Sequence, residues 1–579
     1  ASDTILFNIP GTGPHTIAPI SQLPLITQPV VIDATSEVLP NGTRGIELDG
    51  SLAGLADGLI IQSGNVTVRG LVINQFSDSG IKFISNVGTQ NGLVTGCYIG
   101  TDPTGMMALG NGGDGIEMTQ SSGVIGGALA SERNIISANG DRGVRVTGSL
   151  AGITLVIGNY IGVAADGVTD LGNAQHGVQL SSSDNRVGGA GGQRNVISGN
   201  GGDGVRIERQ IFGAQFGPEA NENTVVGNYI GTDVTGEIAI RNEFQGVHII
   251  NGSGNTIGGA ETGLRNVISG NRRRGVTITA VSALNLAGFS QNNVVIGNYI
   301  GLSASGAAMG NLRSGVVLEE VQGTSESFVL SNRISGSAAG EGNVIGGNTS
   351  SGIAAQLGSA GTTIEGNFIG TDPTGTQARP NGEAGVALID SQGNTVGGPS
   401  ASQRNVISGN DDDGVRILTI GEASTPANSN TVLNNYIGTN ATGTAALPNS
   451  LYGVRIIGGS NNQIGDAFLT GNAGNVISGN GLGGIGIGVD TPDFEEAGTT
   501  ANNVIQNNRI GTNAAGNAAI PNTGHGIFVT QIGGIIIEGG TNILTSGTMI
   551  GSAGITITQG GNLISGNGAD GLHNGIRIE

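Results

Sequence analysis

Aspartates recur in a set of similar loops, each of which follows a short apolar segment. Such oxygen-rich loops are typical of Ca²⁺ sites. Asn440 and Asn513 take the same place in later loops, however, and an Asx turn accepts either residue. A turn is therefore the simpler interpretation, and calcium binding is the alternative. The four candidate metal ligands are Asp102, Asp166, Asp233 and Asp372.

Basic residues beside acidic ones are the other candidates for chemistry. Lys82 is the only lysine in the chain, and it lies toward the N-terminal end. Arg206 and Arg416 each follow an aspartate in the motif D-G-V-R. Because that motif recurs, we interpret it as structural. We assign no catalytic residue and no cofactor.

These residues sit within a repeat that must position them. The hexamer NVISGN occurs at 195–200, 266–271, 405–410 and 475–480. It belongs to a unit of three apolar segments, G-V-x-I, N-x-V/I and N-x-I-S/G, with no helical period. Three short strands joined by turns fit each unit. Units start at Gly80, Gly115, Gly143, Gly177, Gly204, Gly246, Gly275, Gly315, Gly352, Gly385, Gly414, Gly453, Gly484, Gly526 and Gly554, with an earlier turn near Gly58 and a fragment at Gly575.

The third segment is the most regular part of the unit. It has Ile at its third position in every unit and Asn two positions earlier in all but two, where Cys97 and Thr548 stand. Identical residues in successive coils would stack, so that Ile fills a narrow interior and Asn amides bond from coil to coil. The alternative is that each Asn serves only its own turn. The expected ladder contains Asn134, Asn159, Asn195, Asn228, Asn266, Asn298, Asn367, Asn405, Asn435 and Asn475.

The repeat resembles the coil of right-handed parallel β-helices, the pectate-lyase-like architecture. It is most similar to long repeat regions of large secreted or surface proteins of bacteria. The segments DTILFNIPGTGPHTI (3–17) and VRGLVINQFSDSGI (68–81) resemble the start of such regions. The resemblance implies an all-β fold, a single-stranded right-handed parallel β-helix of about 16–17 coils with three short strands each. It implies no particular activity, because its motif consists of structural positions.

Some enzymes of this architecture pair aspartates with a Gly-His-Gly motif. Asp411-Asp412-Asp413 and Gly524-His525-Gly526 resemble that pair. Both precede a unit start and would occupy one corner three coils apart, a separation of about 14 Å. That is too far for cooperating acid and base groups. His176 stands at a matching turn, so we interpret these histidines as occupants of a permissive site.

Two kinds of coil alternate, and one carries a long loop after its third strand. We expect seven such loops in a row at one corner, about 10 Å apart. The outward-facing residues of the third strands would form an apolar stripe, which must be covered or must bind a partner. We favour a lid formed by the loops, with a lateral partner as the alternative. The aromatic members of this candidate interface are Tyr98, Tyr160, Tyr229, Tyr299, Phe368 and Tyr436.

Composition narrows the classes of partner. The formal net charge is −20, which argues against nucleic acid. No apolar run is long enough to span a bilayer. Cys97 is the only cysteine, so an internal disulfide is impossible. We expect an extracellular or cell-surface location after removal of a signal peptide that this sequence does not contain.

We therefore predict N-terminal strands and a cap in 1–57 and a β-helix repeat domain in 58–579. The predicted function is structural or adhesive, with the protein itself, other surface components or glycans as partners. The alternative is a polysaccharide-binding or polysaccharide-cleaving enzyme. The C-terminal segment 562–579 has no evident cap. It would either continue into a further domain or accept the strands of another copy, giving end-to-end assembly.

Overall fold

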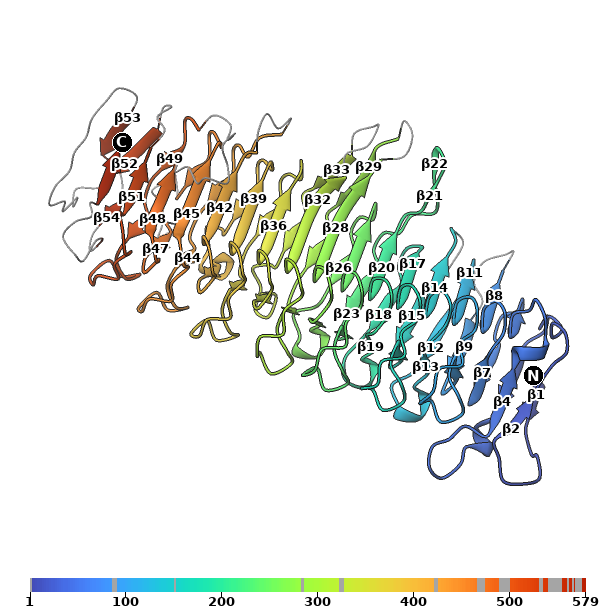
Figure 1. Ribbon diagram of the computed structural model, residues 1–579. Helices are drawn as coiled ribbons and strands as arrows, with labels where there is room; N and C mark the ends of the chain where they lie inside the picture. Colours follow the sequence, from blue (N-terminus) through green and yellow to red (C-terminus); the bar gives the residue numbers. More distant parts are fainter. Residues whose placement is uncertain are drawn as a thin grey trace. The chain divides into compact units, whose positions relative to one another are not determined.

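The chain folds as a right-handed parallel β-helix, as the repeat predicts. The computed structural model describes residues 3–85, 91–149, 152–282, 286–321, 327–420, 425–465, 474–488, 500–530, 535–539, 555–559, 562–564, 567 and 575–578. Its contacts divide it into two compact units, the first essentially Ala1–Val276 and the second essentially Gly306–Glu579 with Ala287–Leu302. Within each unit the chain visits three parallel sheets in turn (Figure 1).

We name the sheets by the order of strands in a coil. In the first unit the first sheet contains β5 (Leu59–Ile61), β8 (Ile81–Ile84), β11 (Ile116–Thr119), β14 (Val144–Thr147), β17 (Val178–Ser181), β20 (Val205–Glu208) and β25 (Val247–Ile250). The second sheet contains β1 (Asp3–Leu6), β3 (Val30–Asp33), β6 (Thr67–Arg69), β9 (Asn91–Thr95), β12 (Ser122–Gly126), β15 (Thr154–Ile157), β18 (Arg186–Gly188), β23 (Thr224–Val226) and β26 (Thr256–Ile257). The third sheet contains β2 (His15–Ile17), β4 (Ile46–Asp49), β7 (Leu71–Asn74), β10 (Tyr98–Ile99), β13 (Ile135–Ile136), β16 (Tyr160–Ile161), β19 (Val196–Ile197), β24 (Tyr229–Ile230) and β27 (Val267–Ile268).

The second unit has the same three-sheet plan. Its first sheet contains β28 (Val276–Val281), β32 (Val316–Val321), β36 (Ile353–Gln356), β39 (Val386–Ile389), β42 (Val415–Leu418), β45 (Tyr452–Ile457), β48 (Gly483–Ile487), β51 (Ile527–Val529) and β55 (Ile576–Ile578). The second sheet contains β30 (Val294–Val295), β34 (Arg333–Ile334), β37 (Thr363–Ile364), β40 (Thr395–Val396), β43 (Thr431–Val432), β46 (Gln463–Ile464), β49 (Val504–Ile505), β52 (Ile535–Gly539) and β53 (Ile555–Gln559). The third sheet contains β31 (Tyr299–Ile300), β35 (Val344–Ile345), β38 (Phe368–Ile369), β41 (Val406–Ile407), β44 (Tyr436–Ile437), β47 (Val476–Ile477), β50 (Arg509–Ile510) and β54 (Leu563–Ile564).

A few short elements lie outside these sheets. They are the hairpin β21 (Ile211–Phe212) and β22 (Gln215–Phe216), the parallel pair β29 (Gly288–Gln291) and β33 (Ser327–Leu330), and the 3₁₀ turns η1 (Thr35–Glu37), η2 (Gly50–Leu52), η3 (Ala130–Glu132), η4 (Gly191–Gln193), η5 (Thr262–Leu264) and η6 (Ala401–Gln403).

The register places like residues on top of one another. Val178, Val205 and Val247 are successive partners in the first sheet. In the third sheet Ile161 pairs with Ile197, and both side chains are fully buried. Side chains alternate along a strand, so the Val and the Ile of each G-V-x-I segment point inward and the x residue points outward. The core is therefore a set of stacked Ile and Val side chains enclosed by the three sheets.

The asparagine ladder of the third strands is present in both units. In the first unit Nδ2 of Asn134 donates to Oδ1 of Asn159 at 2.9 Å, and the series continues through Asn195 and Asn228 to Asn266. In the second unit it runs from Asn298 through Asn343 to Asn367, and further. The later members are Asn405, Asn435, Asn475, Asn508 and Asn562.

Two more ladders accompany it. One is formed by the second Asn of NVISGN, for example Asn200 donating to Asn242 at 3.0 Å, and turns the chain after the third strand. The other precedes the second strand, where Asn185 donates to Asn223 at 3.0 Å. The sequence indicated the turn role of the second Asn, but the ladder before the second strand was not predicted. All three ladders bond amides and backbone carbonyls that the stacked coils remove from water.

The predicted start of one repeat, at Gly554, was wrong. Residues 554–557 match G-V-x-I, and we expected a first strand there. Instead β53 pairs with β52 in the second sheet, and β51 pairs directly with β55 in the first. Strands of the first and second sheets share the same alternation of apolar and other residues, so the local pattern could not distinguish them. Only the strand pairing does.

The N-terminal strands join the same sheets. β3 pairs with β6, and β4 pairs with β7, so segment 1–57 continues the coil stack. The proposed boundary after residue 57 stays a prediction. The segment 562–579 is described only in part, so its expected role in continuation or assembly lies largely outside the described residues.

The ladder predicts a sharp difference between two Asn→Asp substitutions. Nδ2 of Asn228 donates to the carbonyls of Val187 and Val226 and to Asn266. Asn228→Asp replaces these donors with a buried acceptor, so we expect a loss of at least ~3 kcal/mol, given ~1–3 kcal/mol per unsatisfied buried group. Hydrogen exchange of the amides in β23 and β24, together with the thermal midpoint, measures this.

Asn440→Asp is the matched control. Asn440 lies in a loop, and its Oδ1 accepts the backbone N–H of Thr444 at 2.9 Å. A carboxylate oxygen accepts that bond equally well, as Asp372 does from Thr376 in the matching loop. We expect a change within about 0.5 kcal/mol. Equal effects of the two substitutions would contradict a stabilising ladder.

Candidate functional site

The four candidate calcium ligands all bond their own loops. Oδ1 of Asp102 accepts the N–H groups of Met106 and Met107 at 2.9 Å, and Oδ2 accepts the Thr104 hydroxyl at 2.7 Å. Burial raises the pKa of Asp102, but these hydrogen bonds outweigh it and the net pKa is lowered. Asp233 and Asp372 make the corresponding contacts. Asp166 stands two residues later in its loop and accepts the N–H groups of Val168 and Thr169.

This geometry favours the Asx-turn interpretation of the loops. Among the described residues, no group of three or more His, Cys, Asp or Glu side chains is arranged to hold a metal ion. The role of Asp102 in its loop is filled by Asn440 and Asn513 in later loops, through the same bonds to backbone N–H groups. Calcium binding is therefore not needed to explain these positions, and we do not propose it.

The apolar stripe of the third strands is largely covered, with Tyr98, Tyr160, Tyr229 and Tyr299 buried and Phe368 and Tyr436 half-buried. Tyr160 is 6% exposed and packs in a cluster with Val163, Ile240 and the partly buried Val234 from the long loops. The Arg133 guanidinium lies 4.2 Å from the ring centroid of Tyr160. Arg44, Arg194 and Arg404 lie in the same way over Tyr98, Tyr229 and Tyr436. Residues of the long loops pack over the stripe, as the lid interpretation expects. The arginines that lie over its aromatic rings were not predicted.

The long loops also contact one another. Ala165 donates its backbone N–H to the carbonyl of Gly105 at 2.9 Å, and Val234 donates to Gly167 at 3.0 Å. The second unit repeats this between Ala441 and Gly375. The expected separation of about 10 Å between neighbouring loops was therefore wrong. It assumed loops that project straight outward, whereas each loop crosses two coils and bonds to the next loop.

The two D-G-V-R motifs have the same structural core. Asp203 is almost completely buried, and its Oδ1 accepts the backbone N–H of Gln245 in the next coil at 3.0 Å. Oδ2 lies 3.1 Å from the Arg206 guanidinium. Asp413 likewise accepts the N–H of Tyr452 and pairs with Arg416. This shared part of the motif holds one coil to the next, as the structural interpretation predicts.

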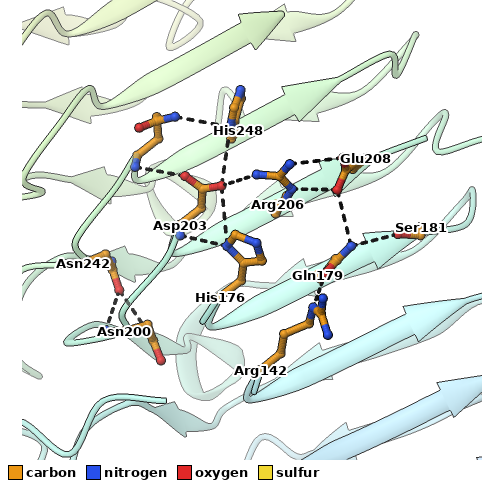
Figure 2. A network of polar contacts seen from close by, with 11 residues as sticks. Arg142, His176, Gln179, Ser181, Asn200, Asp203, Arg206, Glu208, Asn242 and His248 are labelled. Atoms are coloured by element: carbon orange, nitrogen blue, oxygen red, sulfur yellow. Dashed lines mark hydrogen bonds and ion pairs between the residues drawn. The ribbon is translucent and has the colours of Figure 1, made fainter. Parts of the chain in front are cut away.

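The surroundings of the two motifs differ. Asp203 lies between two histidines, one from the preceding coil and one from the following coil (Figure 2). Its Oδ2 is 3.5 Å from Nδ1 of His176 and 3.4 Å from Nδ1 of His248. In place of His248, the second motif has Arg455, with NH1 3.8 Å from Asp413.

The hydrogen bonds determine the state of His176. Its Nδ1 accepts the backbone N–H of Asp203 at 2.9 Å, so in the neutral ring the proton is on Nε2. The pKa of His176 is lowered to about 4, chiefly by burial, with Asp203 opposing this effect and Arg206 and Arg142 adding to it. For Asp203, burial raises the pKa, but His248 and Arg206 outweigh it and hold the pKa well below its usual range. The site therefore joins a neutral imidazole to an ionised carboxylate at neutral pH.

A cavity of about 390 Å³ opens beside this group. Its lining includes His176, Asp203, Arg206 and His248, together with Phe244, Gln245 and Arg273. The Arg273 guanidinium lies 4.2 Å from the ring centroid of Phe244. Gln245 is 7% exposed, and its Oε1 is a buried acceptor without a hydrogen-bond partner in the protein. The cavity thus combines an aromatic ring and a cation, and one of its lining residues has an unsatisfied buried acceptor.

The sequence did not predict this site. His176 was interpreted as a turn residue, and His248, Phe244 and Gln245 were not singled out. The available signal was positional, because His176, Asp203 and Gln245 each immediately precede a unit start. Residues at that position stack at one corner, as the bond from the Gly177 N–H to the Asp203 carbonyl shows.

The other acid–base candidates are not brought together. His525 lies beside Phe528, with 5.3 Å between ring centroids, and 3.5 Å from Arg577. Asp412 and Asp413 instead pair with Arg416. Lys82 lies between two carboxylates in the first sheet and is treated below.

Comparison with known proteins gives structural matches only. No protein-family model and no curated protein sequence matches the chain. The periplasmic alginate epimerase AlgG is 10% identical, with 97% of this chain and 84% of that chain covered and a TM-score of 0.27. The A-module of the Azotobacter vinelandii mannuronan C-5 epimerase AlgE4 is 14% identical, with 78% and 88% covered and a TM-score of 0.27. PfbA, a surface adhesin of Streptococcus pneumoniae, is 10% identical, with 74% and 83% covered and a TM-score of 0.27.

These matches concern the fold alone, and they include both enzymes and an adhesin. Among the residues that the structure describes, no helix has the length and apolar character needed to cross a membrane.

The buried neutral His176 predicts a loss of stability in acid. Its pKa is about 4 in the folded chain, against about 6.5 when unfolded. Below pH 6.5 the unfolded chain takes up this proton first, so the stability contribution is complete above pH 6.5 and is lost as pH falls through 4. The shift corresponds to about 3 kcal/mol. Thermal midpoints from pH 7.5 to 4 measure the loss.

His176→Gln serves as the matched variant because an amide oxygen can still accept the Asp203 N–H but does not titrate. We expect a flatter pH profile for this variant than for the wild type. Identical slopes in the two proteins would show that His176 does not stay neutral in the fold.

Proposed function

We propose that this protein is an extracellular adhesive β-solenoid that binds a glycan in the cavity beside Asp203. The observation that carries the proposal is the cavity lined by Phe244, Arg273 and Gln245, the last with a buried Oε1 that has no hydrogen-bond partner in the protein. A buried polar atom without a partner costs about 1–3 kcal/mol, and a ligand hydroxyl would remove that cost.

The other lining groups suit a saccharide. Phe244 supplies an apolar ring, against which the C–H face of a sugar can pack. The Nε2–H of neutral His176 and the guanidinium of Arg273 supply donors for hydroxyl or carboxylate oxygens. A volume of about 390 Å³ is within the usual range of small-ligand sites and suits one or two sugar units.

The scaffold suits adhesion. Its stacked coils hold the lining residues on β20 and β25 and in the turns before β17, β20, β25 and β28. Ladder bonds such as the one from Asn200 to Asn242 fix these turns. A site built on such strands needs little ordering when it binds, which favours affinity for a weakly interacting ligand such as a glycan. An extracellular or cell-surface location is part of the proposal.

Binding to an array of neutral and acidic oligosaccharides tests the proposal. We expect selective retention of the wild-type protein. Phe244→Ala and Gln245→Leu should each weaken binding about tenfold, because lost stacking or a lost buried hydrogen bond is worth about 1–2 kcal/mol.

Leu451→Ala is the matched control for Phe244→Ala, because Leu451 occupies the corresponding place beside the second D-G-V-R motif. The backbone N–H of Phe244 bonds the Gly202 carbonyl, and that of Leu451 bonds the Asp412 carbonyl. We expect Leu451→Ala to bind like the wild type. A wild-type protein that retains no glycan, or equal losses in all three variants, would contradict the proposal.

A second candidate function, cleavage of the bound glycan, is favoured by the state of His176. A neutral imidazole beside a guanidinium is a suitable proton-transfer group. If this function holds, incubation with the bound glycan should release shorter products, and His176→Gln should abolish release while binding persists. Unchanged glycan after prolonged incubation would leave adhesion as the function.

A further inference from the structure

Lys82 is unusual in this chain because it is the only lysine among the Lys and Arg residues. The chain has 23 such residues in total, and only one is a lysine. Lys82 faces outward from β8, and the corresponding outward positions on β14 and β20 hold Arg145 and Arg206. Arginine forms the better ion pair with a carboxylate, so an ion pair alone does not explain lysine at this place. A primary amine differs from a guanidinium in that it becomes a nucleophile once it loses a proton.

The Lys82 amine lies between two carboxylates. Nζ is 3.1 Å from Oε2 of Glu117 and 3.7 Å from Oδ1 of Asp57. The three residues come from successive coils, because β5, which follows Asp57, pairs with β8, and β8 pairs with β11, which holds Glu117. The sheet register therefore fixes all three side chains within contact distance.

Asp57 is held as an acceptor for nucleophilic attack. Gln22 fixes its backbone through bonds to both the N–H, at 2.9 Å, and the carbonyl, at 3.0 Å. The backbone N–H of Ser79 donates to Oδ1 at 3.1 Å, where it would stabilise the negative charge of a tetrahedral intermediate. Burial raises the pKa of Asp57 despite the nearby Lys82, which favours the uncharged acid from which water can leave.

Glu117 is positioned to carry protons. Its Oε1 accepts the Thr119 hydroxyl at 2.8 Å and lies 3.6 Å from Arg145. These contacts leave Oε2 directed at Lys82, where it can take a proton from Nζ and return it. Burial lowers the pKa of Lys82, but the hydrogen bond and charge of Glu117 and the charge of Asp57 outweigh it, so the net pKa is raised. The ammonium therefore persists, and the reaction depends on this internal transfer.

We propose that Lys82 and Asp57 condense into an intramolecular isopeptide bond, with Glu117 as the proton carrier. Glu117 takes one proton from the ammonium and passes it to the Asp57 carboxylate, and the amine lone pair of Nζ then attacks Cγ of the resulting uncharged acid. The tetrahedral intermediate loses one carboxyl oxygen as water, with a proton from the amine passing through Glu117. Overall, one ammonium and one carboxylate give one amide and one water, and no oxidant or cofactor is needed.

The bond would fasten two neighbouring coils of the first unit. A covalent link between Asp57 and Lys82 restricts the unfolded chain in the way that a disulfide does. This chain cannot form an internal disulfide, since Cys97 is its only cysteine. The inference does not depend on glycan binding, because the glycan cavity is lined by other residues.

Counting reactive amines tests the proposal directly because Lys82 is the only lysine. Purified wild-type protein is denatured and treated with an amine-acylating reagent, and its intact mass is measured before and after. We expect a mass lower by one water than the sequence requires, and labelling at the α-amine only. Peptide mapping should recover the segments around Asp57 and Lys82 joined together.

Two variants serve as matched controls. Glu117→Gln retains Lys82 and Asp57 but cannot carry the proton, so we expect the full mass and labelling at two amines. Lys82→Arg should show the full mass and one label, and a lower thermal midpoint than the wild type. Wild-type protein of full mass that accepts two labels, even after prolonged incubation in the folded state, would overturn the proposal.

Discussion

The need to bond buried backbone groups at the coil corners governs this structure. Each coil turns where its backbone leaves the sheet ladder, and the neighbouring coils exclude water from those turns. Stacked asparagine amides meet this need, because an amide both donates and accepts and so can bond the coil before and the coil after. Asn228, for example, bonds two carbonyls and two ladder partners. The repeated Asn at each end of NVISGN follows from this requirement.

Because the asparagine ladders hold the coil corners, the residue types at the outward-facing positions of the sheets can vary. The first unit uses this freedom on its first sheet, where Lys82, Glu117 and Arg145 form one ion-paired group. Farther along the same sheet the outward positions contribute to the cavity, with Arg206 and His248 beside Asp203. Functional chemistry in a solenoid thus depends on which residues occupy equivalent positions in successive coils, and not on sequence motifs within one coil.

The two D-G-V-R motifs have the same structural role, but only the one at Asp203 lies in the candidate site. In both, a buried aspartate bonds the backbone of the following coil, and the arginine three residues later in the same coil neutralises it. Only at Asp203 do histidines flank the carboxylate. On the third sheet, loop residues and arginines pack over the aromatic stripe, for which the sequence favoured a lid and left a lateral partner as the alternative.

The sequence by itself determined the fold, the inward-facing Ile and the asparagine ladder, because these depend on residues that recur at one place in every coil. It also indicated that the aspartates of the long loops serve turns, since Asn440 replaces them. The tertiary structure alone decided which sheet receives β53, how the loops bond to one another and that His176, Asp203 and Gln245 line one cavity. Those features depend on contacts between coils some thirty residues apart, and the spacing varies with each loop. A local sequence pattern does not show which residues of different coils lie side by side, whereas the strand pairing determines it.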